Sequence, residues 1–114
     1  MASGRMRRVD EAVRQVLSDA MTNALKDPRI GFVTVTDVNT SPDLRHATVY
    51  VSVLGDEEQR EASLDGLRAA QGYLQGRIAS ELRLKYTPSL VFQYDDTTDR
   101  ALRLERLMKE GDEQ

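Results

Sequence analysis

Small residues and cations recur together in residues 66–94, in a pattern suited to binding a polyanion. Gly72, Gly76 and Ser80 fall four residues apart, so on a helix they would share one face. A face without large side chains lets a nucleic-acid backbone approach closely, and cations beside it bind phosphate. Glu81 is the single acidic residue of this stretch, against four basic ones, Arg68, Arg77, Arg83 and Lys85. The pattern predicts phosphate-backbone recognition by Gly72, Gly76, Arg77, Ser80, Arg83 and Lys85. Two alternatives do not involve RNA: Gly72 could simply break a helix, and the stripe of small residues could pack against another helix.

A second group of cations, Arg5, Arg7 and Arg8, stands at the N-terminus, with Arg14 further along. Positive charge at the start of a helix opposes the helix dipole, which favours a partner that supplies negative charge. A solvated helix face is the alternative. Arg45 and His46, at a predicted hairpin turn, are expected at the edge of the same RNA site. Arg29 is expected to form a structural ion pair.

Four elements are predicted before residue 66. Apolar residues at helical spacing indicate a long amphipathic helix that ends at Asp27-Pro28; they are Val9, Val13, Val16, Leu17, Ala20, Met21, Ala24 and Leu25. Phe32–Asn39 and His46–Leu54 alternate like strands, and the turn residues 40–43 between them predict an antiparallel hairpin. In the second strand, Ala47, Val49, Val51 and Val53 are expected to face inward. A helix then begins in the acidic residues 55–65.

A pair of helices and a third strand follow. Leu64, Leu67 and Ala70 form one helical stripe, Gly72 is expected to break it, and Leu74, Ile78 and Leu82 form the next. Thr87-Pro88 is expected to end this helix, because proline disfavours a helical residue before it. Leu90, Phe92 and Tyr94 then alternate as a strand, and a last short helix is expected from Ala101 to Met108. Gly66 is expected to be merely tolerated.

The predicted order is therefore α-β-β-α-(kink)-α-β, an α+β fold. A right-handed crossover through the paired helices would make the second and third strands parallel, giving a three-stranded mixed sheet with helices on one face. This is the arrangement of a type II K-homology (KH) domain. The expected division is a KH-like RNA-binding domain over residues 1–96, with a short C-terminal helix and acidic tail over residues 97–114.

Composition limits the function classes. The chain has 114 residues, which suits one domain, and no cysteine, which excludes disulfides and thiol chemistry. No apolar run is long enough to cross a bilayer and the N-terminus has no signal core, so a cytoplasmic protein is expected. The net charge of −3 argues against nucleic acid. However, residues 1–94 hold 12 basic and 12 acidic side chains, whereas residues 95–114 hold 4 and 7.

Several segments resemble the ribosome-binding factor A family. These are Leu25-Lys26-Asp27-Pro28-Arg29-Ile30-Gly31, Val33-Thr34-Val35-Thr36-Asp37-Val38, Ala47-Thr48-Val49-Tyr50-Val51-Ser52 and Leu82-Arg83-Leu84-Lys85-Tyr86-Thr87-Pro88-Ser89-Leu90-Val91-Phe92. The resemblance covers roughly Arg5 to Met108. Ala101 is a departure, because many members have glycine there.

The resemblance implies a bacterial assembly factor that binds the free, immature 30S small ribosomal subunit. Members promote 16S rRNA maturation, including 5′-end processing, and matter most in the cold. They have no catalytic activity and a type II KH-like fold, in which an Ala-x-Gly kink replaces the usual loop. That kink maps onto Ala70-Gln71-Gly72, which adds Ala70 and Gln71 to the expected RNA site. A monomer with no cofactor, metal, membrane or small-molecule substrate is expected.

Three other readings stay open at this point. Asp95, Asp96 and Asp99 could form a metal cluster of an enzyme, although helix capping is commoner, and the only histidine, His46, has no evident partner. The acidic residues 55–65 or the tail could dock a protein partner. A binder of free single-stranded RNA would stack bases on Tyr73 and Tyr86. The scarcity of aromatics favours shape and backbone recognition.

Overall fold

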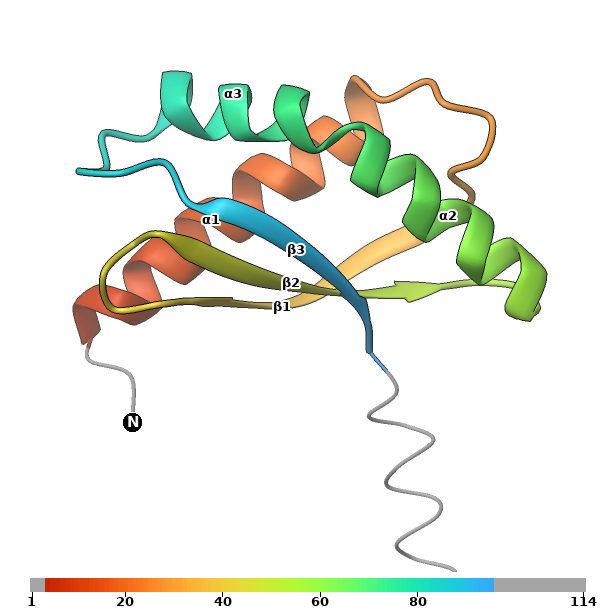
Figure 1. Cartoon of the computed structure of the whole chain (residues 1–114), viewed down its shortest axis with the longest axis horizontal. Helices are drawn as coiled ribbons and strands as arrows, with labels where there is room; N and C mark the ends of the chain where they lie inside the picture. Colours follow the sequence, from red (N-terminus) through yellow and green to blue (C-terminus); the bar gives the residue numbers. More distant parts are fainter. Residues whose placement is uncertain (1–3, 96–114) are drawn as a thin grey trace, which may run out of the picture.

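The structure is a computed structural model that describes residues 4–95. Along these residues it has the order α1 (Gly4–Asn23), β1 (Val33–Thr40), β2 (His46–Val53), α2 (Glu57–Ala69), α3 (Gln71–Glu81) and β3 (Ser89–Tyr94). Figure 1 shows α2 and α3 above the strands, with α1 running behind them. This order is the one expected from the sequence. The predicted helix over residues 101–108 and the tail lie outside the described residues.

The three strands form one mixed sheet in the order β1-β2-β3. β1 and β2 are antiparallel, with a register shift between Val35 and Asp37 that leaves Thr36 as the extra residue of a bulge. β2 and β3 are parallel, and Ala47 lies beside Leu90 and Val49 beside Phe92. The mixed sheet confirms the expected pairing of the second and third strands.

One face of the sheet carries the core. Ala47, Val49 and Val51 are fully buried, while the alternate residues Thr48 and Tyr50 are partly exposed. The same buried cluster contains residues of all three helices, among them Val13, Leu17, Leu67, Leu74 and Ile78. The helices therefore cover one face and leave the other open, which confirms the predicted fold class and the inward-facing residues of β2.

Two predicted helix ends are wrong by a few residues. α1 ends at Asn23 rather than at the predicted Asp27-Pro28, and beyond it the amide groups of Ala24 and Leu25 both donate to the Ala20 carbonyl. α3 ends at Glu81, because Leu82 already has extended backbone (φ −117°, ψ 138°). Pro88 therefore lies in the loop before β3 and does not end the helix.

The break between α2 and α3 lies at Ala70 rather than at Gly72. The Ala70 amide is shared between the Gly66 and Leu67 carbonyls at 3.1 Å each, and Gly72 lies in the first turn of α3. Gln71 donates to the Leu90 carbonyl at 2.7 Å, and the Leu90 amide donates to Gln75 at 3.0 Å. These two side chains tie the start of α3 to the edge of β3, so tertiary hydrogen bonds help to set the new helix direction.

Gly66 is required by packing and not merely tolerated. It is buried, and a Cβ atom there would lie 2.6 Å from Cγ1 of Ile30. The same contact region holds Ser63, whose hydroxyl accepts from the Gly31 amide at 3.1 Å and donates to the Arg29 carbonyl at 3.4 Å. The loop between α1 and β1 therefore packs directly on the backbone of α2.

We expect Gly66→Ala and Gly76→Ala to shift stability in opposite directions. Overpacking costs about 1–3 kcal/mol, and the 2.6 Å approach to Ile30 puts this case in the upper part of that range, above the roughly 1 kcal/mol gained in helix propensity. At Gly76 nothing lies within 4 Å of an added Cβ, so only the gain remains. Denaturant unfolding measures both variants. Equal shifts of the same sign would show that Ile30 can move away without cost.

Candidate nucleic-acid interface

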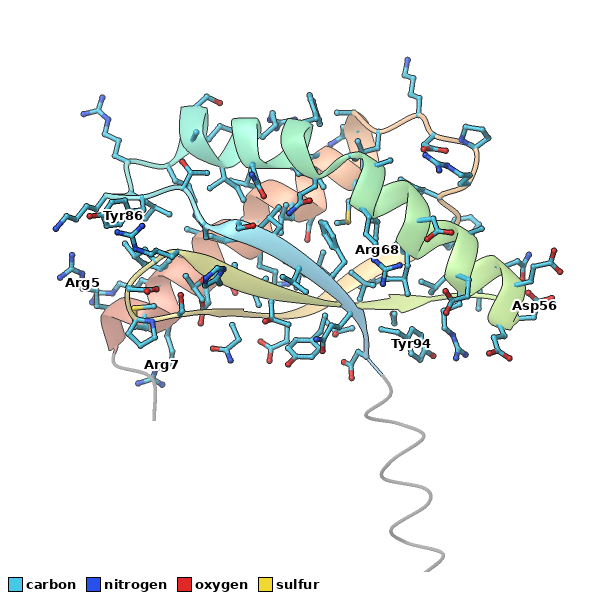
Figure 2. All side chains as sticks on the ribbon, viewed as in Figure 1. Arg5, Arg7, Asp56, Arg68, Tyr86 and Tyr94 are labelled. Carbon is cyan, nitrogen blue, oxygen red and sulfur yellow. The ribbon has the colours of Figure 1, made fainter. Side chains whose placement is uncertain are left out.

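A groove lined by cations lies at one end of the molecule, where three distant segments meet. Its volume is about 650 Å³. The first turns of α1, the β1–β2 turn and the loop between α3 and β3 contribute the residues of this cationic groove, which are Arg5, Met6, Val9, Pro42, Asp43, Leu44, Arg45, Arg83, Leu84, Lys85 and Tyr86. Figure 2 shows Arg5 and Tyr86 close to each other at this end. The structure thus brings together four predicted RNA-binding residues, Arg5, Arg45, Arg83 and Lys85.

Local hydrogen bonds hold the β1–β2 turn in a defined shape. The Ser41 hydroxyl donates to Asp43 at 2.6 Å, and the Arg45 amide donates to the same carboxylate oxygen at 3.1 Å. These bonds, the Ser41 bond first, hold the pKa of Asp43 below its ordinary value. Leu44 has φ +63°, a left-handed conformation that costs a non-glycine residue about 1–2 kcal/mol. The turn therefore places Leu44 and Arg45 in the groove at some conformational cost.

Tyr86 organises the basic side chains of the cationic groove. The guanidinium carbon of Arg45 lies 4.5 Å from the centre of the Tyr86 ring, and Nζ of Lys85 lies 5.6 Å from it. Cations at these distances are attracted by the ring electrons. The backbone supports this contact, because the Ser89 amide donates to the Arg45 carbonyl at 2.8 Å. Tyr86 remains 39% exposed, so it can also contact a ligand.

The charges of the groove are available to a ligand. Within residues 4–95, none of the ion pairs includes Arg5, Arg45, Arg83 or Lys85. Asp43 is the one carboxylate among the lining residues, and it is engaged in the turn. Four cations around one tyrosine suit phosphate groups together with a planar base.

The other N-terminal arginines do not line this groove. Arg7 lies on a different depression between α1 and the bulged part of β1, together with Asp10, Glu11, Arg14 and Asp37. Arg8 is exposed and lines neither depression. Arg14 is bound to Glu11. Of the three predicted N-terminal arginines, only Arg5 is gathered into the groove.

Arg77, which was predicted to bind phosphate, is instead held in structural ion pairs. Its guanidinium contacts Asp19 of α1 at 2.9 Å and Glu81 at 2.5 Å, and it also donates to the Tyr73 hydroxyl at 3.3 Å. Glu81 first, then Tyr73 and Asp19, raise the Arg77 pKa. Arg77 therefore joins α1 to α3. Arg29 likewise forms an ion pair, with Asp27 at 2.6 Å, as expected.

The small-residue stripe on α3 is open. Gly72, Gly76 and Ser80 are exposed, and nothing lies within 4 Å of a Cβ atom added at either glycine. The alternative that this stripe packs against another helix is therefore excluded for residues 4–95. Exposed glycines cost a helix about 1 kcal/mol each relative to alanine. Their presence on an open face is consistent with close approach of a partner.

The predicted RNA site is consequently split in two. The break at Ala70 and the loop with Arg83 and Lys85 stand at opposite ends of α3, whose 11 residues span roughly 16 Å. Gln71 is engaged with β3. The turn residues 42–44 were not predicted for the site, and Tyr86 was predicted only as a stacking ring in the single-stranded-RNA alternative. The available signal was Tyr86 directly after Lys85, but its contact with Arg45 depends on a long-range strand pairing.

The suggested metal cluster is not supported by the described residues. Asp95 accepts a hydrogen bond from Thr36 at 2.6 Å, whereas Asp96 and Asp99 lie outside residues 4–95. Within that range no group of three or more His, Cys, Asp or Glu side chains could hold a metal ion. None of the three described helices is long and apolar enough for a bilayer span.

Comparisons with known proteins agree on one family. A family model described as ribosome-binding factor A matches residues 5–108. The chain is 43% identical over 114 residues to ribosome-binding factor A of Halothermothrix orenii, covering all of this chain and 93% of that protein. It resembles the crystal structure of ribosome-binding factor A from Thermus thermophilus with a TM-score of 0.70 and 28% identity, over 78% of this chain and 94% of that one. A homology model of the Thermus thermophilus protein, fitted into a cryo-EM map of a 30S complex, matches with a TM-score of 0.64 and 29% identity, over 76% and 91% of the two chains.

We expect the contribution of Arg77 to stability to decrease in acid. The Arg77 hydrogen bond first, then that of Asn23, holds the Asp19 pKa below its ordinary value of 3.8. Stability from such a carboxylate is complete above the unfolded pKa and is lost as pH falls through the lower folded pKa. The thermal midpoint of Arg77→Met should therefore lie below that of the unaltered chain near neutral pH and approach it as the pH falls below 3.8.

Asp19→Asn is the control for this measurement. It removes the Asp19 titration and keeps Glu81. In a chain that already carries Asp19→Asn, adding Arg77→Met should therefore lower the thermal midpoint by less, and this difference should vary less with pH. If the thermal midpoints of Arg77→Met and the unaltered chain differ by the same amount from neutral pH to about pH 2.5, the assigned ion pair is wrong.

Proposed function

The chain belongs to the ribosome-binding factor A family, and from this premise we propose that it binds the free, immature small ribosomal subunit and promotes maturation of its 16S rRNA. The observation that carries the proposal is the cationic groove, which collects four cations in a chain whose net charge is −3. The Thermus thermophilus relative fitted into a 30S complex supports the same partner.

The groove would bind RNA through its backbone and one unpaired base. Guanidinium groups donate several hydrogen bonds in a fixed geometry, which matches phosphate oxygens, while Lys85 adds a mobile point charge. Arg45 is oriented by the Tyr86 ring, 4.5 Å away, so less side-chain freedom is lost on binding. The open small-residue stripe of α3 leads from the kink toward the groove and would accept the adjoining backbone.

The proposed action is stoichiometric rather than catalytic. A protein that binds one rRNA conformation better than another shifts their populations by its difference in affinity. Such a bias would expose the precursor for 5′-end processing by other factors. It would matter most in the cold, where misfolded RNA pairings are more stable. We propose that the protein works in the cytoplasm as a monomer, without cofactor, metal or small-molecule substrate.

Replacing two groove cations should weaken binding to the subunit without unfolding the protein. Arg83→Ser with Lys85→Ser changes two exposed loop residues. We expect the affinity for purified small subunits to fall by about tenfold or more, because charge-assisted hydrogen bonds are lost. The slope of log affinity against log salt should fall by roughly one for each phosphate contact removed. Gradient co-sedimentation at several salt concentrations measures both quantities.

Lys26→Ser with Arg68→Ser is the matched control, because it makes the same change in net charge away from the groove. Arg68 lies on α2, well away from Arg5 and Tyr86 (Figure 2). The control should bind within about twofold of the unaltered chain. Equal losses for both pairs would mean that charge in general, and not the cationic groove, determines binding.

Filling the small-residue stripe should separate stability from binding. Gly76→Gln introduces a good helix former into open space, so the free energy of unfolding should rise by about 0.5–1 kcal/mol. The added side chain would hold an RNA backbone away from α3, so co-sedimentation should decrease. Unchanged binding by this more stable variant would remove the stripe from the interface and leave the groove alone.

A further inference from the structure

Two large apolar side chains stand exposed at the end of the β1–β2 hairpin opposite its turn, one just before β1 and one just after β2. Phe32 is 80% exposed and Leu54 is 75% exposed. The Leu54 amide donates to the Phe32 carbonyl at 3.0 Å, which continues the register that pairs Val33 with Val53. Because Val53 is buried, alternation places Leu54, and Phe32 opposite it, on the open face of the sheet. We call these two residues the apolar pair.

The backbone around the apolar pair is rigidly held. Gly55 follows with φ +135°, a conformation that other residues rarely adopt. Asp56 and Gln59 then form a capping box, in which each side chain accepts from the other's backbone amide at 2.9 Å. Just before Phe32, the Gly31 amide donates to the Ser63 hydroxyl of α2. These hydrogen bonds hold the backbone on both sides of the apolar pair, so less conformational entropy is lost when a partner binds.

The chain that follows Leu54 is acidic. Residues 54–65 contain five acidic side chains, Asp56, Glu57, Glu58, Glu61 and Asp65, and one basic one, Arg60. Arg60 is partly buried, with its guanidinium carbon 3.8 Å from the centre of the Tyr94 ring. In the adjacent loop Arg29 is bound to Asp27, and Lys26 is exposed. Figure 2 shows Asp56 at the opposite end of the molecule from Arg5 and Tyr86.

This charge pattern decides which class of partner suits the surface. RNA and anionic lipid would be repelled by the acidic residues, and so would the same surface of a second copy. Residues 95–114 of the chain itself also carry a net negative charge, but their four basic side chains all lie within residues 100–109, so attachment of this segment is one of the outcomes that the test below separates. A basic protein surface is attracted by the acids, and an apolar side chain on it can cover Phe32 and Leu54.

We propose that the apolar pair and the acidic start of α2 dock onto a basic protein segment that carries an exposed apolar side chain and belongs to the same small subunit. This inference rests on the proposed function. Two side chains bury far less than the roughly 1,200–2,000 Å² of a stable interface. The contact therefore acts as a second attachment, made once the cationic groove has engaged rRNA, and gains strength from the high effective concentration of the bound state.

Photo-crosslinking within the complex tests the proposal. Phe32→benzoylphenylalanine keeps an aromatic side chain at this exposed position, and Tyr86→benzoylphenylalanine reports on the cationic groove. Each variant is bound to purified small subunits, irradiated and analysed by size. Position 32 should give an adduct that protease removes and nuclease does not, whereas position 86 should give an RNA adduct. Val91→benzoylphenylalanine, 46% exposed on the same open face, should give much less of the protein adduct.

Several results would overturn the proposal. These are an RNA adduct at position 32, an adduct with this chain alone, no adduct, or an equal yield of the same protein adduct from position 91. If the protein binds small subunits and position 86 reaches RNA while position 32 fails, only this inference is wrong. If the unaltered chain does not co-sediment with small subunits at low salt, both the inference and the proposed function fail.

A pair of serine substitutions provides a second measurement. Phe32→Ser with Leu54→Ser should lower the affinity for intact small subunits by about tenfold, as expected for loss of central apolar contacts. The same variant should bind protein-free 16S rRNA like the unaltered chain. An equal loss on protein-free rRNA, or no loss on the subunit, would contradict a protein contact.

Discussion

The parallel pairing of β2 with β3 is the constraint on which the rest of the structure depends. It aligns His46 with Ser89, and the Ser89 amide bonds the Arg45 carbonyl at 2.8 Å. This places the end of the α3–β3 loop against the β1–β2 turn, so that Arg45 and Tyr86 can meet. The same pairing requires α2 and α3 to cross over the sheet between the two strands, because parallel strands need a long connection. The core and the cationic groove therefore share one cause.

The fold separates basic and acidic residues in space, which the net charge of the chain does not reveal. The first turns of α1, the β1–β2 turn and the α3–β3 loop bring cations to one end, while the start of α2 brings acids to the other. A molecule with such a charge separation is turned by the field of a polyanion, so its basic end arrives first. Arg77, on α3, shows that a basic residue can serve packing instead, since its ion pair with Asp19 holds α1 on α3.

Glycines that look alike in the sequence have different roles in the structure. Gly66 lets Ile30 approach the α2 backbone, where a Cβ would lie 2.6 Å from the isoleucine. Gly76 has no such neighbour and faces open space. Gly72 does not form the break expected there, because the break lies at Ala70, where Gln71 and Gln75 bind both backbone groups of Leu90. A local pattern cannot distinguish these cases, because each depends on residues distant in the chain.

The sequence by itself determined the order of the elements, the mixed sheet, the inward-facing residues of β2 and the family, because these follow from periodicity and local motifs. It also identified Arg5, Arg45, Arg83 and Lys85 as candidate ligands for phosphate. Only the tertiary structure decided that these four residues share a groove with Tyr86, that Arg77 is an ion-pair partner, and that Phe32 and Leu54 stand exposed side by side. The physical reason is the sequence separation of the residues that interact. Hydrophobic periodicity reports on a few neighbouring residues, whereas a binding surface is formed by segments that only long-range strand pairing and helix packing bring together.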